Sequence, residues 1–207
     1  MNGSGRRLVV WMLGMVMLLL AGCAVAPPRN IENACSIFDE KSDWYKIMQD
    51  NHKKWGVPVH VQLAIIHQES KFTHDARPPR GKLFWFIPWS RASSAYGYAQ
   101  VLDGTWNWYK SKTGNWRADR DNYKDAVDFI GWYVNISHRV LGISKWDAES
   151  QYLAYHEGHG GYKRKSYRKK KWLMEVARKV KRLSGRYRSQ LAHCKDRLER
   201  GSGGWFF

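Results

Sequence analysis

Apolar residues recur at helical intervals in one segment of this 207-residue chain after another, and glycines and prolines separate the segments. Spacings of three and four residues place such side chains on one face of a helix, whereas no stretch shows the alternation of a long strand. The pattern predicts helices over about 39–55, 58–70, 104–113, 122–141, 147–158, 169–183 and 186–198. We therefore expect an all-α fold, with at most a small β-hairpin within residues 80–100.

The composition excludes several classes of protein. Hydrophobic residues make up 43% of the chain, with 12 Trp, 11 Tyr and 7 Phe, and disordered chains lack such aromatics. Only one stretch is apolar enough to enter a membrane, which excludes a protein with several spans. Three cysteines are too few for a scaffold built on disulfides. The length suggests one domain with a short appendage.

The charge is concentrated near the C-terminus. The chain carries a net charge of +17, and residues 163–200 hold 16 Lys and Arg against three Asp and Glu. Residues 23–162 are almost balanced, with 17 basic and 15 acidic side chains. We therefore expect a nearly neutral domain followed by a basic helical tail. Such a tail should attract a polyanion: nucleic acid, anionic lipid head groups or acidic wall polymers.

The N-terminus narrows this choice. Arg6 and Arg7 precede an uncharged run over 8–20, which is too short to span a membrane but suits a signal peptide. The run ends in Leu-Ala-Gly before Cys23, which resembles a bacterial lipobox. The resemblance implies a signal peptide over 1–22, acylation of Cys23, and a lipidated tether over 23–35. A buried helix with a chance cysteine is the alternative.

A lipidated chain lies outside the cytoplasm, which argues against nucleic acid as a partner. In the lipoprotein pattern, an Asp after the acylated Cys retains the protein at the inner membrane. Ala24 takes that position here, so we expect the periplasmic face of the outer membrane. The other two cysteines, Cys35 and Cys194, lie in an oxidising compartment, and we expect a disulfide between them. Two free thiols are the alternative.

One carboxyl stands out as a candidate acid. Ile65 and Ile66 precede Glu69 by four and three residues and therefore share its face of the predicted helix. A carboxyl on an apolar face is costly to ionise, so its pKa rises and it stays protonated, as a general acid requires. A glutamate at a frayed helix end, pointing into water, is the alternative.

Three sequence blocks follow one another around this glutamate. They are Gln68-Glu69-Ser70-Lys71-Phe72, then Ser94-Ala95-Tyr96-Gly97-Tyr98-Ala99-Gln100 with Thr105 beyond it, then Ala154-Tyr155-His156-Glu157-Gly158. Their order resembles the soluble lytic transglycosylase (SLT) domain of the lysozyme-like superfamily, with its E-S-x-F, G-L-M-Q and A-Y-N-x-G motifs. The chain departs from these motifs at Tyr98-Ala99 and at His156. The resemblance implies a lysozyme-like domain over 36–162. We expect the basic helical tail to occupy 163–200, and the glycine-rich end of the chain to form a flexible C-terminus over 201–207.

The resemblance also implies an activity, which is cleavage of the MurNAc–GlcNAc bond of peptidoglycan with formation of a 1,6-anhydro-MurNAc end. Glu69 matches the single catalytic acid and base, and Tyr155 matches the tyrosine whose hydroxyl orients it. Contacts to the glycan are implied for Ser70, Tyr98, Gln100 and His156. No cofactor is implied. The partners would be glycan strands, the membrane through Cys23, and anionic wall polymer or lipid head groups through the tail.

Two rival functions stay open at this point. A hydrolytic muramidase would need a second carboxylate, and Glu157, Asp75 and Asp103 are the candidates. The second rival is a non-catalytic lipoprotein that binds the wall through its tail. For Glu157 we favour the alternative of a surface residue at a helix end, because glutamates are mostly exposed.

Two further patterns are weaker. A zinc helix requires histidines four residues apart, but His156 and His159 are three apart, so no metal is predicted. Several tryptophans are candidates either for stacking on sugar rings or for the core, namely Trp85, Trp89, Trp106 and Trp108.

Overall fold

The structure is a computed structural model that describes residues 25–83, 87–91 and 93–202. The predicted signal peptide, Cys23, Trp85 and most of the predicted flexible C-terminus lie outside the described residues. Within them, no helix is long and apolar enough to cross a membrane. The fold is mostly helical, which confirms the predicted class.

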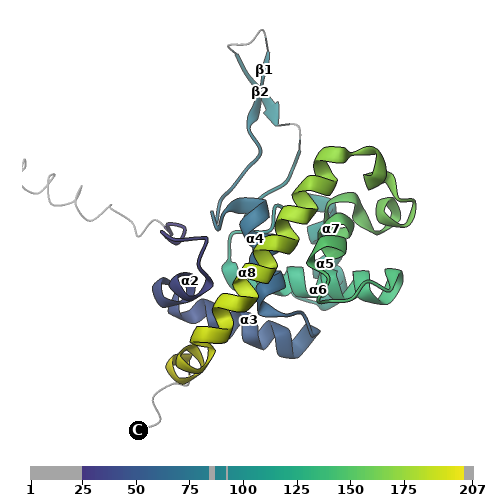
Figure 1. Cartoon of the computed structure of the whole chain (residues 1–207). Coiled ribbons are helices and arrows are strands. Elements are labelled where there is room, and N and C mark those ends of the chain that lie inside the picture. The colour runs from purple at the N-terminus through teal and green to yellow at the C-terminus, as the bar shows by residue number, and fades with distance from the viewer. Residues whose placement is uncertain (1–24, 84–86, 92, 203–207) are drawn as a thin grey trace, which may run out of the picture.

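Helices form the body of the molecule, and one hairpin projects from it (Figure 1). The elements in chain order are α2 (Ala34–Glu40), α3 (Ser42–Trp55), α4 (Val59–Ser70), β1 (Arg80–Leu83), β2 (Ile87–Arg91), α5 (Asp103–Thr113), α6 (Tyr123–Leu141), α7 (Ala148–Lys163), the 3-10 helix η1 (Ser166–Lys169) and α8 (Lys171–Ser202). Strands β1 and β2 pair antiparallel, with Arg80 opposite Arg91. The small hairpin expected within 80–100 is therefore present.

Polar side chains fix where several helices begin. Asn122 and Asp147 accept hydrogen bonds from backbone N–H groups of α6 and α7 respectively. Such caps satisfy donors that have no partner within the helix. Helix α2 was not expected; Asn33 caps it in the same way, and Ala34 and Ile37 are fully buried.

Helix α4 lies at the centre of the body. From Val59 to His67 every side chain is buried, and α4 contacts α3, α6, α7 and α8. A helix that is apolar around its whole circumference must be covered on all sides. Solvent therefore reaches α4 only in its last turn, where Gln68 and Glu69 are half-buried.

The basic segment forms one continuous helix, α8, where the sequence predicted two helices separated at Gly185. Figure 1 shows α8 crossing the helical body, and it contacts α2, α3, α4 and α7. Its buried stripe contains Leu173, Ala177, Val180 and Leu183 and continues through Tyr187, Cys194 and Leu198. The segment expected to be a tail is thus an integral part of the core.

The N-terminal segment is docked onto this helix. A disulfide joins Cys35 to Cys194, the pairing expected from the sequence. Nearby, Gln190 donates a hydrogen bond to the carbonyl of Glu32 and accepts one from the backbone of Ala34. The predicted tether over 23–35 is therefore anchored by its last residues. A crosslink of this span stabilises a fold by roughly 2–5 kcal/mol.

Gly185 provides a test of the continuous α8. A methyl group added at this position meets no atom within 4 Å, and the residue is exposed. Glycine within a helix costs up to about 1 kcal/mol relative to alanine. We expect Gly185→Ala to raise the free energy of unfolding by about 0.5–1 kcal/mol, measured by urea denaturation. A lower stability would mean that the helix is broken there.

Candidate active site

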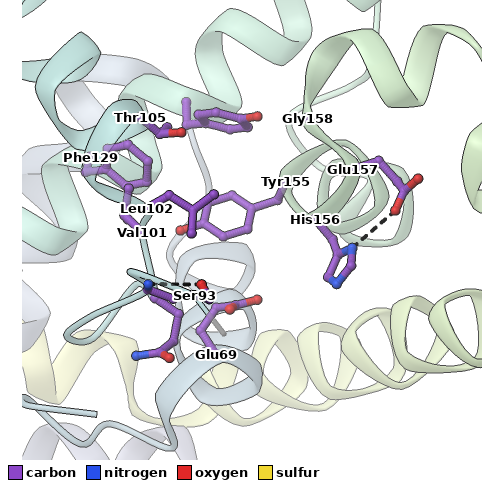
Figure 2. A pocket seen from close by; sticks show the side chains of 13 residues that line it. Glu69, Ser93, Val101, Leu102, Thr105, Phe129, Tyr155, His156, Glu157 and Gly158 are labelled. Atoms are coloured by element: carbon purple, nitrogen blue, oxygen red, sulfur yellow. Dashed lines mark hydrogen bonds and ion pairs between the residues drawn. The ribbon is translucent and has the colours of Figure 1, made fainter. Parts of the chain in front are cut away.

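A cleft of about 470 Å³ opens beside the last turn of α4 (Figure 2). The loop that precedes α5, together with α5, α6 and α7, supplies the other walls. Its lining residues are Glu69, Ser93, Ala95, Gln100, Val101, Leu102, Thr105, Phe129, Tyr133, Tyr155, His156, Glu157 and Gly158. The structure therefore brings the three sequence blocks together around one cavity.

Glu69 is the half-buried acid of this cleft. Burial raises the pKa of its carboxyl to about 7. A hydrogen bond from the Tyr152 hydroxyl and attraction by Lys71 act in the opposite direction. A large share of the carboxyl is thus protonated near neutral pH, which is the state required of a general acid.

The chain after Glu69 turns sharply. Lys71 and Phe72 both adopt left-handed backbone angles, with φ of 52° and 63°. Residues other than glycine rarely adopt such angles, and each costs on the order of 1–2 kcal/mol. Phe72 is fully buried and contacts the Trp44 ring with a centroid separation of 5.8 Å. Its burial offsets this cost and fixes the end of α4, and thereby Glu69.

Two tyrosines of α7 lie close to Glu69, namely Tyr152 and the Tyr155 inferred from the sequence. Tyr152 hydrogen-bonds the Glu69 carboxyl, whereas the Tyr155 hydroxyl donates to the carbonyl of Ala99 at 2.6 Å. Both lie on α7, and residues three apart share a helix face. Tyr155 lines the cleft and ties α7 to the loop before α5. Tyr152 was missed because the family motif contains Tyr155 alone; the i, i+3 spacing was the available signal.

A tight turn presents Gln100 to the cleft. Gly97 has φ of 77°, and a Cβ there would lie 2.0 Å from the carbonyl oxygen of Arg120, so only glycine fits. The Gln100 amide donates at 2.8 Å to the carbonyls of Ala76 and Gly97. These bonds hold the side chain in the cleft wall. Gln100, for which the sequence implied a glycan contact, therefore lines the cleft.

Two of the inferred contact residues lie elsewhere. Ser70 is buried and its hydroxyl donates to the carbonyl of Ile66, one turn back in α4. Tyr98 is 1% exposed and packs edge-on against the rings of Trp44 and Tyr123. Neither lines the cleft. Both side chains point into the protein core and away from the cleft.

His156 stands at the exposed rim of the cleft, next to a residue that the sequence did not single out. Its ring meets Trp172 edge-on at 5.2 Å between centroids. Trp172 begins α8 and is 53% exposed. Among the earlier candidates for stacking, Trp106 is in the core and Trp108 is 37% exposed against Trp132. Trp89 lies in β2.

Glu157 is a buried, fully engaged carboxylate. Its side chain is 3% exposed, so it is not the surface residue that one interpretation expected. Burial alone would raise its pKa, but hydrogen bonds from Lys170, Ser166 and His156 outweigh burial and lower it. The Lys170 contact is 2.6 Å. In Figure 2 the carboxylate points toward His156 and away from Glu69.

The other carboxylates considered do not line the cleft. Asp103 forms an ion pair with Arg120 at 2.8 Å, and Asp75 is exposed beside His74. Over the part of the chain that the structure describes, no group of three or more His, Cys, Asp or Glu is arranged to hold a metal.

Comparison with known proteins identifies the family. The model of the family described as "Transglycosylase SLT domain" matches residues 11–194. The chain belongs to the SLT transglycosylase family. The match extends beyond the expected 36–162 domain and includes most of α8, in agreement with its packing. No curated protein and no solved structure was found to match the chain.

Membership of the SLT family indicates transglycosylase activity on peptidoglycan. Peptidoglycan lies in the cell envelope, and the Cys35–Cys194 disulfide is consistent with that oxidising location. Among the residues of this SLT domain, Glu69 combines burial, a raised pKa and a position in the cleft.

The two tyrosines of α7 form a matched pair for testing control of Glu69. The Tyr152 hydrogen bond lowers the pKa of the Glu69 carboxyl. We therefore expect Tyr152→Phe to raise that pKa above about 7, measured by NMR titration of the carboxyl carbon. Tyr155→Phe removes a hydroxyl that bonds Ala99 instead, and serves as the control. A larger rise in the Tyr155 variant would restore the role inferred from the sequence.

Proposed function

We propose that this protein is a lytic transglycosylase that cleaves the MurNAc–GlcNAc bond of peptidoglycan, with Glu69 as the single acid and base and a 1,6-anhydro-MurNAc end as the product. The observation that carries this proposal is the Glu69 carboxyl, half-buried in the cleft with a pKa of about 7. The SLT family match supports the same reaction class.

The reaction needs one proton moved twice. Protonated Glu69 donates to the glycosidic oxygen, the bond from that oxygen to C1 breaks, and positive charge develops at the ring. The resulting carboxylate then removes the proton of the sugar's own C6 hydroxyl as its oxygen bonds to C1. The carboxyl ends protonated, as it began, and no water enters the product.

The surroundings of Glu69 suit this double role. A pKa near 7 keeps both protonation states accessible at neutral pH, and a general acid and base works best under that condition. Glu157 is the other carboxylate of the cleft, and its oxygens are occupied by Lys170, Ser166 and His156. A base that activates water would need a free oxygen lone pair facing the substrate. This favours the single-carboxyl reaction over hydrolysis.

Substitution of Glu69 tests the assignment. We expect Glu69→Gln to lower the rate of strand cleavage by about 10²–10⁴-fold or more, because the general acid is lost. The measurement is mass spectrometry of the muropeptides released from purified sacculi. Glu175→Gln, at an exposed position on α8, is the control and should retain full activity.

Two results would contradict the proposal. Cleavage by the Glu69 variant within a few-fold of wild type would remove the residue from the mechanism. Reducing ends in place of 1,6-anhydro ends would identify a hydrolytic muramidase.

The same proposal includes attachment to the envelope. The lipobox-like sequence before Cys23 supports acylation there, and Ala24 supports the periplasmic face of the outer membrane. The basic residues of 163–200 support a second contact, with anionic wall polymer or lipid head groups. Each such residue near an anionic surface contributes about 1 kcal/mol.

The charge contact is testable by sacculus pull-down of the detergent-solubilised full chain. We expect reversal to Glu at Arg168, Lys169 and Lys171 to weaken binding by at least about tenfold, and 1 M salt to do the same to wild type, because the screening length falls to about 3 Å. Lys170 is left intact because it bonds Glu157. Reversal at Lys110, Lys112 and Arg117 is the control of equal charge. Binding to sacculi that is equally strong at low salt and at 1 M salt would contradict the prediction.

A further inference from the structure

A second cavity lies at the last turn of α4, between that helix, α8 and the segment before α2. Its volume is about 410 Å³. It is lined by Glu32, His67, Gln68, Lys71, Lys179, Val180, Arg182, Leu183 and Arg186. We call this cavity the basic pocket, because four of its side chains are cationic and one is acidic.

The single acid of the basic pocket is already engaged. Glu32 forms an ion pair with Arg186 and lies 3.0 Å from the imidazole of His67. In the part of the chain that the structure describes, no carboxylate lies within ion-pair distance of Lys179 or Arg182. These two side chains are exposed and project from consecutive turns of α8. The pocket therefore has an excess of positive charge.

The neighbouring cations affect the pKa of Lys71. Its ammonium lies 3.1 Å from Nδ1 of His67. Burial is the main cause that lowers the pKa of Lys71, and repulsion by Lys179 lowers it further. Attraction by Glu32 and Glu69 acts in the opposite direction. Like charges held together in a cavity repel one another, and a bound anion would relieve that repulsion.

The basic pocket adjoins the cleft through α4. Gln68 lines the pocket and Glu69 lines the cleft, and consecutive Cα atoms lie about 3.8 Å apart. Lys71 is close enough to Glu69 for each charge to shift the other's pKa. The two cavities therefore open at the same turn of α4, and groups attached to the MurNAc units of a strand held at Glu69 need only pass that turn to reach the pocket. In peptidoglycan those groups are peptide stems with several carboxylates.

We propose that the basic pocket binds carboxylates of the peptide stem, through Lys71, Lys179 and Arg182, so that the enzyme prefers stem-bearing strands to bare glycan. This inference rests on the proposed function. Lysine and arginine pair with carboxylates by charge-assisted hydrogen bonds, and such pairs are stronger than neutral ones. Phosphate of a lipid head group has similar chemistry, but no contact of the pocket points to it, whereas Gln68 directly precedes Glu69 and the Lys71 charge acts on the Glu69 carboxyl.

The first experiment measures binding without catalysis. The full-length Glu69→Gln protein in detergent is titrated calorimetrically with a synthetic stem tripeptide carrying its free carboxylates. We expect saturable binding that weakens with salt, and at least a tenfold loss when Lys179→Glu and Arg182→Glu are added. The milder Lys179→Gln, Arg182→Gln pair guards against misfolding. Lys112→Glu with Arg117→Glu, exposed and outside both the pocket and residues 163–200, is the control of equal charge.

Three results would overturn the inference. They are an absence of peptide binding, equal losses in the pocket and control variants, and binding of inorganic phosphate in place of the peptide, which would indicate a lipid head-group site.

The second experiment compares cleavage of two substrates by the active protein. One is an uncrosslinked strand with stems, and the other is the same strand after an amidase has removed them. We expect wild type to cleave the stem-bearing strand several-fold faster, and the ratio of the two rates to fall toward one in the pocket variant but not in the control. A ratio near one in wild type would overturn the inference. Absence of cleavage of either strand would instead contradict the proposed function, and peptide binding would still decide on the pocket.

Discussion

Enclosure of α4 is the constraint on which the rest of the structure depends. A helix that buries every side chain from Val59 to His67 needs neighbours around its whole circumference, and α3, α6, α7 and α8 supply them. Only the last turn escapes this cover, at Gln68 and Glu69. The cleft and the basic pocket both open at that turn, on either side of it. The position of the site thus follows from the way the core is closed.

The same packing separates the roles of two carboxyls in one cleft. Glu69 has a single hydroxyl partner, Tyr152, so burial prevails and its pKa rises to about 7. Glu157 is also buried, but an ammonium and two further donors reverse the effect and lower its pKa. Opposite shifts in neighbouring carboxyls commonly distinguish an acid from a structural or electrostatic group. Glu157 accordingly fixes α7 to the start of α8.

Local sequence could predict part of this arrangement. The helical class follows from apolar spacing, and the order of the motifs carries Glu69 and Gln100 to the cleft. The orientation of side chains within a motif could not be predicted, because it depends on tertiary packing. Tyr152 and Tyr155 share a helix face, yet the Tyr152 hydroxyl bonds the Glu69 carboxyl and the Tyr155 hydroxyl bonds the carbonyl of Ala99, and Tyr98 lies in the core. Tertiary packing also explains why α8 continues through Gly185. The helix buries an apolar stripe on both sides of this glycine, and that burial outweighs the low helix propensity of one residue.

Helix α8 shows how a charged segment can be both core and site. Its apolar stripe packs on α4, and this leaves its basic side chains on the outer faces. Two contacts fix its position: the Cys35–Cys194 disulfide near its C-terminal end and the ion pair of Glu157 with Lys170, the residue just before its first turn. A helix held at both ends presents the same residues to its neighbours throughout. The basic side chains that the sequence suggested as a tail therefore have fixed positions on the surface of the body. Trp172 is likewise held in place, against His156 at the rim of the cleft.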